Sequence, residues 1–174
     1  LGLLFLGKQE RADAMCEAPK TIEHKISKYA LITLESCAYA ATGNVLTVQK
    51  MMHECAEHID EEKDKNGSAH QSVACLGIAL ICTGETVGSQ MAIRTYDHLL
   101  QYGDKPIRLA TPLALALQHI SLPAYSVIDT LSRLSHDADT EVRVLLLACV
   151  CCGSVCCALW IARFCVMRAH PCYA

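Results

Sequence analysis

Aromatic side chains and basic stretches are scarce in this sequence of 174 residues. Phe, Trp and Tyr make up 5% of the chain, and 15 Lys and Arg residues stand against 18 Asp and Glu residues, for a net charge of −3. Because no run of Lys or Arg is dense enough to attract a phosphate backbone, nucleic acid is not expected as a partner. The apolar residues, 52% of the chain, are enough to bury one hydrophobic core.

The long apolar stretches lack the strict alternation that half-buried strands show. They are rich in Ala, Leu and Ile, so the sequence predicts an all-α fold. The first residue is Leu1, and the short apolar opening has no basic segment before it, unlike a signal peptide. We interpret the chain as beginning inside a longer protein.

Motifs of the common enzyme classes are missing from residues 1–143. There is no Gly-x-Ser-x-Gly elbow, no phosphate-binding loop and no paired Cys-x-x-Cys spacing of a zinc site. The chain is therefore not expected to be an enzyme. No catalytic, metal-ligating or cofactor-binding residue is assigned, and no cofactor is expected.

The segment HECAEH has the composition of a metal site without its geometry. His53 and His58 are five residues apart, and a helix turns by roughly 140° between such positions, so the two imidazoles cannot share an ion. We interpret both as surface histidines of an amphipathic helix.

A second polar segment, LSHDADTEV, gathers His136, Asp137, Asp139 and Glu141. These side chains could in principle bind a metal or transfer protons. We interpret the segment as a turn between helices, in which Asp139 caps a helix that begins near Thr140 and Glu141 lies favourably in its first turn.

Twelve cysteines are unevenly distributed, with seven of them in the last 26 residues. The other five stand singly among apolar neighbours, as buried free thiols do: Cys16, Cys37, Cys55, Cys75 and Cys82. This pattern favours a reducing compartment over a disulfide framework.

Three segments share one design, in which a short apolar helix is followed by a glycine and a second amphipathic segment. They are LGLLFLGKQERADAM, CAYAATGNVLTVQKMM and LGIALICTGETVGSQMAI, and their glycines Gly7, Gly43 and Gly84 are 36 and 41 residues apart. A fourth copy, PLALALQHISLPAYSVIDTL, has Ser121 near the glycine position. This period predicts stacked helix pairs, an α-solenoid.

Glycines inside or beside helices need a reason, because each one weakens a helix interior by about 1 kcal/mol relative to alanine. We predict that those at helix ends serve as left-handed caps and that those inside let a neighbouring backbone approach closely. The glycines assigned to the repeat are Gly2, Gly7, Gly43, Gly77 and Gly84.

Periodicity locates several helices. Residues 21–37 place one set of side chains on a common face: Ile22, Ile26, Tyr29, Ala30, Thr33 and Cys37. Residues 45–59 show a second stripe: Val45, Val48, Met52, Cys55 and Ile59.

Other helix limits are predicted from capping residues and prolines. Ser68 and Gln71 resemble a capping box, and Pro106 suits the first turn of a helix that Pro112 should kink or break. The charged segment 57–70 is predicted to be a short solvated loop between helices, with an acidic docking segment as the alternative.

Several sequence segments resemble the proteasome/cyclosome repeats of the largest non-ATPase subunit in the base of the 26S proteasome regulatory particle. They are LGLLFLGKQE, CAYAATGNVL, VACLGIALICTGETVGSQMAIRTYDHLLQYG, PLALAL and VIDTLSRLSHDADTEV, within residues 1–143. The resemblance covers about three and a half repeats, too few to close the family's ring of helix pairs, so a partial toroid is expected.

The resemblance implies a non-catalytic scaffold in the cytoplasm and nucleus. Its implied partners are the proteasomal ATPase subunits and, in the full-length parent, ubiquitin and ubiquitin-like domain proteins. The family's ubiquitin-docking helices correspond to positions upstream of Leu1, so no ubiquitin-binding residue is carried over. The loop at 57–70 is shorter than the acidic insertion that family members often carry there.

After residue 143 the resemblance stops, and residues 144–174 form a divergent, Cys-rich apolar tail. Residues 144–162 contain no charge over 19 positions and are followed by Arg163 and Arg168, as in a membrane-spanning helix with a cytoplasmic flank. We interpret the tail nevertheless as a divergent end translated from a noncoding segment, because family members continue at this point with another glycine-bearing repeat; the alternatives are a membrane anchor and a zinc cluster of the tail cysteines. A generic helical-repeat adaptor and a single-pass membrane protein therefore remain alternative functions.

Overall fold

A computed structural model describes residues 2–57, 69–119, 124–134, 136 and 139–142 of the chain. Two short 3-10 helices, η1 (Gly2–Phe5) and η2 (Gln9–Ala12), are followed by seven α-helices in these ranges. The α-helices are α1 (Asp13–Lys20), α2 (Lys25–Ala38), α3 (Val45–Ala56), α4 (Ala69–Cys82), α5 (Thr86–Tyr102), α6 (Lys105–Gln118) and α7 (Tyr125–Leu134). No strand occurs in the described ranges, and the all-α prediction is confirmed.

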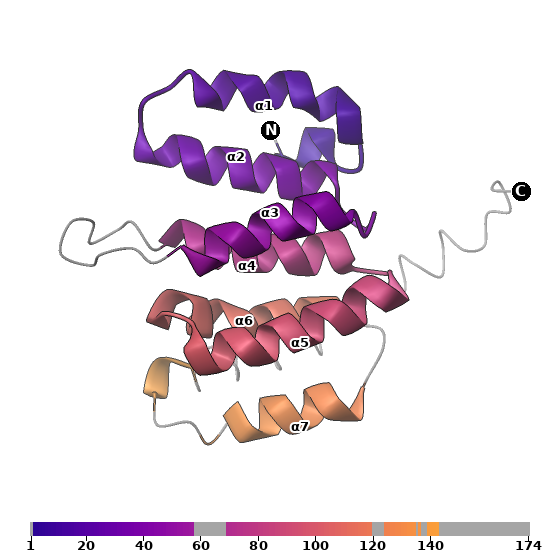
Figure 1. Ribbon diagram of the computed structural model, residues 1–174, viewed down its shortest axis with the longest axis vertical. Coiled ribbons are helices and arrows are strands. Elements are labelled where there is room, and N and C mark those ends of the chain that lie inside the picture. The colour runs from indigo at the N-terminus through magenta and orange to yellow at the C-terminus, as the bar shows by residue number, and fades with distance from the viewer. Residues whose placement is uncertain (1, 58–68, 120–123, 135, 137–138, 143–174) are drawn as a thin grey trace, which may run out of the picture.

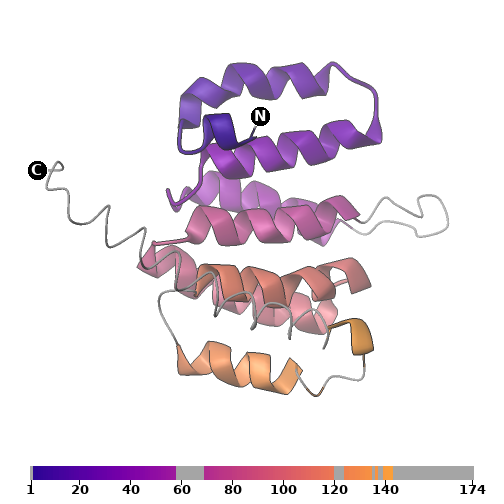
Figure 2. The same cartoon turned by 180° about the vertical axis from the view of Figure 1, so that it is seen from behind.

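The helices stack along the long axis of the molecule (Figure 1). Three inner helices, α2, α4 and α6, are neighbours in the stack, with α4 packed against both of the others. Each outer helix packs against the inner helix that follows it in sequence, so that α1 contacts α2, α3 contacts α4, and α5 contacts α6 (Figure 2). This arrangement of helix pairs is that of an α-solenoid.

Helix α4 forms the centre of the hydrophobic core because it has packed neighbours on most sides. Its fully buried apolar side chains are Ala74, Cys75, Ile78, Ala79, Ile81 and Cys82. Met51 of α3 and Tyr96 of α5 are also fully buried and join the same cluster. A helix that is buried in the middle of a stack is apolar around most of its circumference, whereas the outer helices keep one polar face.

Three glycines in the turns that lead from one element to the next adopt left-handed backbone conformations: Gly7 lies between η1 and η2, Gly43 between α2 and α3, and Gly84 between α4 and α5. The φ angles of Gly7, Gly43 and Gly84 are 70°, 63° and 87°. The amide of Gly7 donates to the carbonyl of Cys37 over 3.0 Å, and the amide of Gly43 donates to the carbonyl of Ile81 over the same distance. The first hydrogen bond links the turn at Gly7 to the C-terminal end of α2, and the second links the turn at Gly43 to the C-terminal end of α4.

Two other glycines lie where elements approach one another closely. A Cβ atom on Gly77 of α4 would overlap Ser36 Oγ of α2, and one on Gly2 of η1 would lie 3.0 Å from Cys37 Sγ. The missing side chains therefore bring each element closer to α2 than alanine would allow. That all five glycines mark one sequence repeat stays a prediction.

Replacing Gly7 or Gly84 with alanine is expected to lower the free energy of unfolding by about 1 kcal/mol, the strain of an L-residue at positive φ. A Cβ atom at either site would have no described heavy atom within 4 Å, so steric overlap adds nothing. Asparagine tolerates this conformation better, and G7N and G84N are expected to lose less. Urea denaturation of the four variants measures the difference; equal stability of wild type, G7A and G84A would contradict the assigned turns.

The predicted apolar face of residues 21–37 is wrong over most of its length. Ile22 and Ile26 are 61% and 65% exposed, and the face that α2 buries instead includes Ile32, Glu35 and Ser36. The reason is that η1, a single turn of helix, covers only the Cys37 end of the predicted face.

The stripe predicted for residues 45–59 is partly right. Val48 and Cys55 are buried, whereas Val45 is more than half exposed. Met51, which the stripe omits, is fully buried against α4. Ile59 lies outside the described residues.

Proline had two predicted effects on α6, and one of them is wrong. Pro106 lies in the first turn, as expected. Pro112 does not break the helix, which continues from Lys105 to Gln118. Pro112 is itself fully buried in the stack, so the packing of α6 supports the helix where the proline removes an intrahelical hydrogen bond.

Several predicted features lie outside the described residues: Ser68 of the capping box, most of the loop at 57–70, Ser121 and the whole tail 144–174. Helix α4 does begin at Ala69, directly after Ser68. Among the helices that the structure describes, none has the length and apolar character needed to cross a membrane. The division of the chain at residue 143 stays a prediction.

Candidate functional site

The histidines of HECAEH do not form a site together. His53 is exposed in the last turn of α3, as predicted, and His58 lies outside the described residues.

The LSHDADTEV segment behaves as a connection between helices. Residues 140–142 are helical, which confirms that a helix begins at Thr140. The carboxylate of Glu141 lies 3.1 Å from Lys105 Nζ in the first turn of α6. His136 is exposed, and Asp137 is outside the described residues. This segment therefore contacts the start of α6. His53 lies in α3, in a different helix pair, so it does not form a site with these residues.

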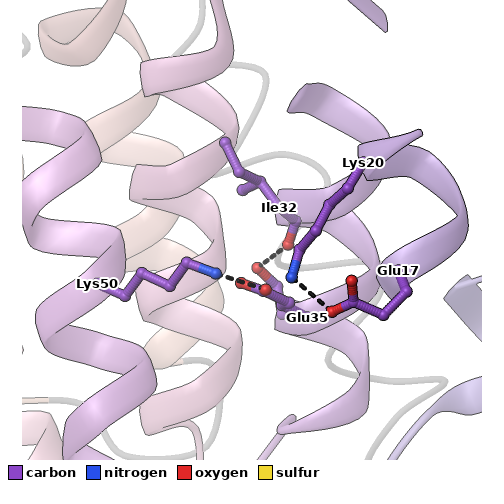
Figure 3. Close-up of polar contacts among 6 residues, drawn as sticks. Glu17, Lys20, Ile32, Glu35 and Lys50 are labelled. Carbon is purple, nitrogen blue, oxygen red and sulfur yellow. Dashed lines mark hydrogen bonds and ion pairs between the residues drawn. The ribbon is translucent and has the colours of Figure 1, made fainter. Parts of the chain in front are cut away.

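Two ion pairs lie near each other on the first three α-helices, one within α1 and one between α2 and α3 (Figure 3). Lys50 Nζ of α3 lies 2.5 Å from Glu35 Oε1 of α2, and Lys20 Nζ of α1 lies 2.7 Å from Glu17 Oε1. The hydrogen bond from Lys20 to Glu17 raises the pKa of Lys20, and the negative charge of Glu35 adds to the effect. The Glu17–Lys20 spacing is visible in the sequence, whereas the Glu35–Lys50 pair exists only because α2 and α3 fold together.

Breaking the Glu35–Lys50 pair is expected to reveal a coupling energy of about 1 kcal/mol in a double-mutant cycle of E35Q and K50M. The side chain of Glu35 is 12% exposed and that of Lys50 is 47% exposed, so solvent screens the pair only in part. The matched control is the exposed Glu17–Lys20 pair, for which the coupling should be clearly smaller because water screens both charges. Equal coupling energies for both pairs would show that the burial of Glu35 contributes nothing.

The cysteines before residue 143 are free thiols, and burial raises the pKa of each of them. Cys16, Cys55, Cys75 and Cys82 are buried, as predicted, and Cys37 is half-buried; none of these five forms a disulfide. Burial raises the pKa of Cys55 to about 12 and the pKa values of Cys75 and Cys82 to about 11. Because the thiolate is the nucleophile, these residues are unsuited to covalent catalysis at neutral pH.

Alkylation with iodoacetamide at pH 8 is therefore expected to modify Cys55, Cys75 and Cys82 only after unfolding, and mass spectrometry of the peptides can measure this. Their folded pKa values lie above the ordinary value of 9.0, so the stabilisation from keeping these thiols neutral is complete below pH 9 and is lost as pH rises toward 11 to 12. Modification of all three in the native protein as fast as in urea would contradict the described core.

An open groove runs along the outer face of α5. It is lined by Val87, Gln90, Met91, Arg94, Thr95 and His98. These positions recur every three or four residues, so they form one mixed apolar and basic stripe on the helix. The stripe could not be singled out from the sequence, because its residue types do not differ from those of an ordinary amphipathic helix.

The described fold defines a helical-repeat protein of the α-solenoid class. The chain is 52% identical over 144 residues to 26S proteasome non-ATPase regulatory subunit 2 homolog A of Arabidopsis thaliana, a match that covers 83% of this chain and 16% of the relative. Over this segment the chain belongs to the family of 26S proteasome non-ATPase regulatory subunit 2.

Other relatives give the same result. Identity is 50% over 142 residues to 26S proteasome non-ATPase regulatory subunit 2 of Dictyostelium discoideum, covering 82% of this chain and 15% of the relative. It is 46% over 142 residues to 26S proteasome regulatory subunit rpn1 of Schizosaccharomyces pombe, covering 82% and 16%. No family model matches the chain. The chain thus spans about 16% of these relatives, and the names of the Arabidopsis and Dictyostelium relatives, which designate them non-ATPase regulatory subunits, agree with the expectation that the chain is not an enzyme.

Proposed function

We propose that the chain is a scaffold segment in the base of the 26S proteasome regulatory particle, where it supports ubiquitin-dependent protein degradation. The observation that carries this proposal is the 52% identity to a proteasomal regulatory subunit along a chain that folds as stacked helix pairs. The segment would act in the cytoplasm and nucleus, with the proteasomal ATPase subunits as neighbours.

The fold supports a mechanical role. Inner helices that share one continuous core resist bending at the joints between pairs, because any relative movement exposes buried side chains such as Ile78 and Tyr96. The Glu35–Lys50 ion pair adds a polar contact between α2 and α3. The hydrogen bonds donated by the main-chain amides of Gly7 and Gly43 add two more between neighbouring elements. A stack of this kind holds partners at fixed separations.

The outer row offers the surface for such partners. Leu46 of α3, Val87 and Tyr102 of α5, and Tyr125 of α7 are all strongly exposed on outer helices. Ubiquitin and ubiquitin-like proteins would bind to docking helices elsewhere in the full-length parent. The segment would then contribute to their capture by holding those helices in place.

A segment exchange tests the proposal. The matching part of the Arabidopsis homolog A is replaced by the matching part of this chain, and assembly of the regulatory particle is followed on native gels together with degradation of a ubiquitinated substrate. We expect incorporation with the ATPase subunits and retained degradation. A chimera that is folded and monodisperse but does not co-purify with the ATPases would overturn the proposal and favour a generic helical-repeat adaptor.

The matched control for this exchange is the same chimera carrying G77V, which places a branched side chain between α2 and α4. It should incorporate poorly because the stack is disturbed. Equal incorporation of both chimeras would show that assembly does not depend on the packing of the inner helices.

A further inference from the structure

Three metal-ligating side chains meet where α3 ends and α4 begins. Glu54 lies in the last turn of α3, Glu57 directly follows that helix, and His70 is the second residue of α4. One ligand atom from each lies within 4.8 Å of the other two, and His70 Nε2 is 3.9 Å from Glu54 Oε2. The group is not apparent in the sequence, because the charged connection separates His70 from the glutamates.

The donor set suits a transition metal. An imidazole nitrogen with carboxylate oxygens is a common ligand set for zinc and similar divalent ions, whereas magnesium and calcium favour oxygen alone. Tetrahedral Zn²⁺ with ligands at roughly 2.0–2.2 Å places its donors roughly 3.4 Å apart, so each of the three must move inward by roughly 1 Å or less. Glu57 is exposed and its side-chain torsions can supply this movement.

Two of the surrounding side chains fix the geometry of the group. His70 is 5% exposed, and its ring packs edge-on against Tyr29, with centroids 6.3 Å apart. Gln71 is fully buried, and its amide nitrogen donates to the main-chain carbonyls of Glu54, over 3.4 Å, and of Glu57. Because one side chain holds the main chain of both glutamates against α4, their carboxylates start close to His70 and need only side-chain rotation to reach an ion.

The amide oxygen of Gln71 provides an independent indication of a ligand. It is buried beside the same turn and has no hydrogen-bond partner within the part of the chain that the structure describes. A buried oxygen in this situation commonly accepts from an ordered water or contacts an ion. An ion held by the neighbouring carboxylates, or its coordinated water, would satisfy this oxygen.

We propose that Glu54, Glu57 and His70 form a binding site for a divalent transition-metal ion, with Zn²⁺ as the best fit. The ion offsets the two carboxylate charges and leaves at least one coordination position to water. It also ties the end of α3 to the start of α4. The inference concerns this chain alone and does not depend on the proposed proteasomal role.

Zinc uptake by the full chain tests the site. After chelator treatment, the wild type, E57Q, H70A and H53A are titrated with Zn²⁺ by calorimetry. E57Q should bind one equivalent at least tenfold more weakly, and H70A should lose that equivalent. H53A is the matched control, since His53 is an exposed histidine of α3 next to Glu54 and outside the group, and it should bind like the wild type.

Two measurements distinguish this site from zinc bound by the tail cysteines. Only zinc at the proposed site is weakened by E57Q and H70A, and X-ray absorption should show nitrogen and oxygen ligands there, whereas the cysteines would contribute sulfur. E57Q changes an exposed residue, so its folding is expected to match that of the wild type even where H70A is unstable. Identical zinc stoichiometry and affinity in the wild type and E57Q, or sulfur as the only ligand type, would overturn the proposal.

Discussion

Substitution of Gly77 by valine is expected to lower the free energy of unfolding by about 2–3 kcal/mol, through overpacking between α2 and α4. A Cβ atom there would overlap Ser36 Oγ and lie 3.3 Å from Ser36 Cβ. Ser36 is buried and its hydroxyl donates to the carbonyl of Ile32 over 2.6 Å, so it cannot move aside without losing that hydrogen bond. Chemical denaturation followed by circular dichroism measures the loss.

Two further variants show whether the contact with Ser36 is the cause. In G77A combined with S36G, the atoms that would overlap are absent, so the double variant should be more stable than the sum of the single effects predicts. Gly88 of α5 is the matched control, because the nearest atoms to a Cβ there are 3.5 Å away and G88A should gain up to about 1 kcal/mol of helix propensity. A destabilised G88A with an unaffected G77V would contradict the described packing of the inner helices.

Truncation of Tyr96 to alanine is expected to have the largest effect of all, a loss of about 4 kcal/mol. The side chain is fully buried in the cluster shared by α4 and α5, and its hydroxyl donates to the carbonyl of Cys75 over 3.4 Å. The truncation removes the ring and opens a cavity beside α4. Thermal unfolding of the variant should show a midpoint far below that of the wild type.

Two controls separate the ring from the hydroxyl. Y96F keeps the ring and should lose about 1 kcal/mol, the net contribution of one hydrogen bond. Tyr102 lies on the same helix and is 75% exposed, so Y102A should change stability by less than about 0.5 kcal/mol. Similar losses of stability in Y96A and Y102A would show that α5 does not bury the face that carries Tyr96.

The order and class of the elements could be predicted from the sequence, because a period of about 40 residues with a glycine between helical segments has few physical solutions. The buried thiols Cys55, Cys75 and Cys82 were also predictable, since each stands among apolar neighbours in a helix. These features depend on the pattern of apolar residues and glycines along the chain, and that pattern also predicts the helix pairs.

Features that depend on neighbours in space could not be predicted. Ile22 and Ile26 have the spacing of a buried face, but no described element covers them. Pro112 should break a helix on local grounds, and yet it lies inside α6, where it is fully buried in the core. Tertiary packing overrides local preference at both places.

Among the candidate sites, too, contacts within one helix could be predicted from the sequence, whereas contacts between helices could not. The Glu17–Lys20 pair follows from sequence spacing, whereas Glu35 meets Lys50 and His70 meets Glu54 only after the helices pack. His53, His58 and His136 stand beside carboxylates along the chain, so they were the histidines that the sequence offered as candidates. His70 stands beside carboxylates only in space, and no sequence pattern points to it.

Hydrogen exchange at the amides of Gly7 and Gly43, followed by nuclear magnetic resonance, tests the stacking of helix pairs most directly. Both amides lie in turns, where an exposed N–H exchanges rapidly, and each donates to the end of the next inner helix. If the pairs stack as described, these two amides exchange as slowly as the amides in the middle of α4. Exchange of both at the rate of an unfolded chain, while α4 remains protected, would contradict the stacked arrangement.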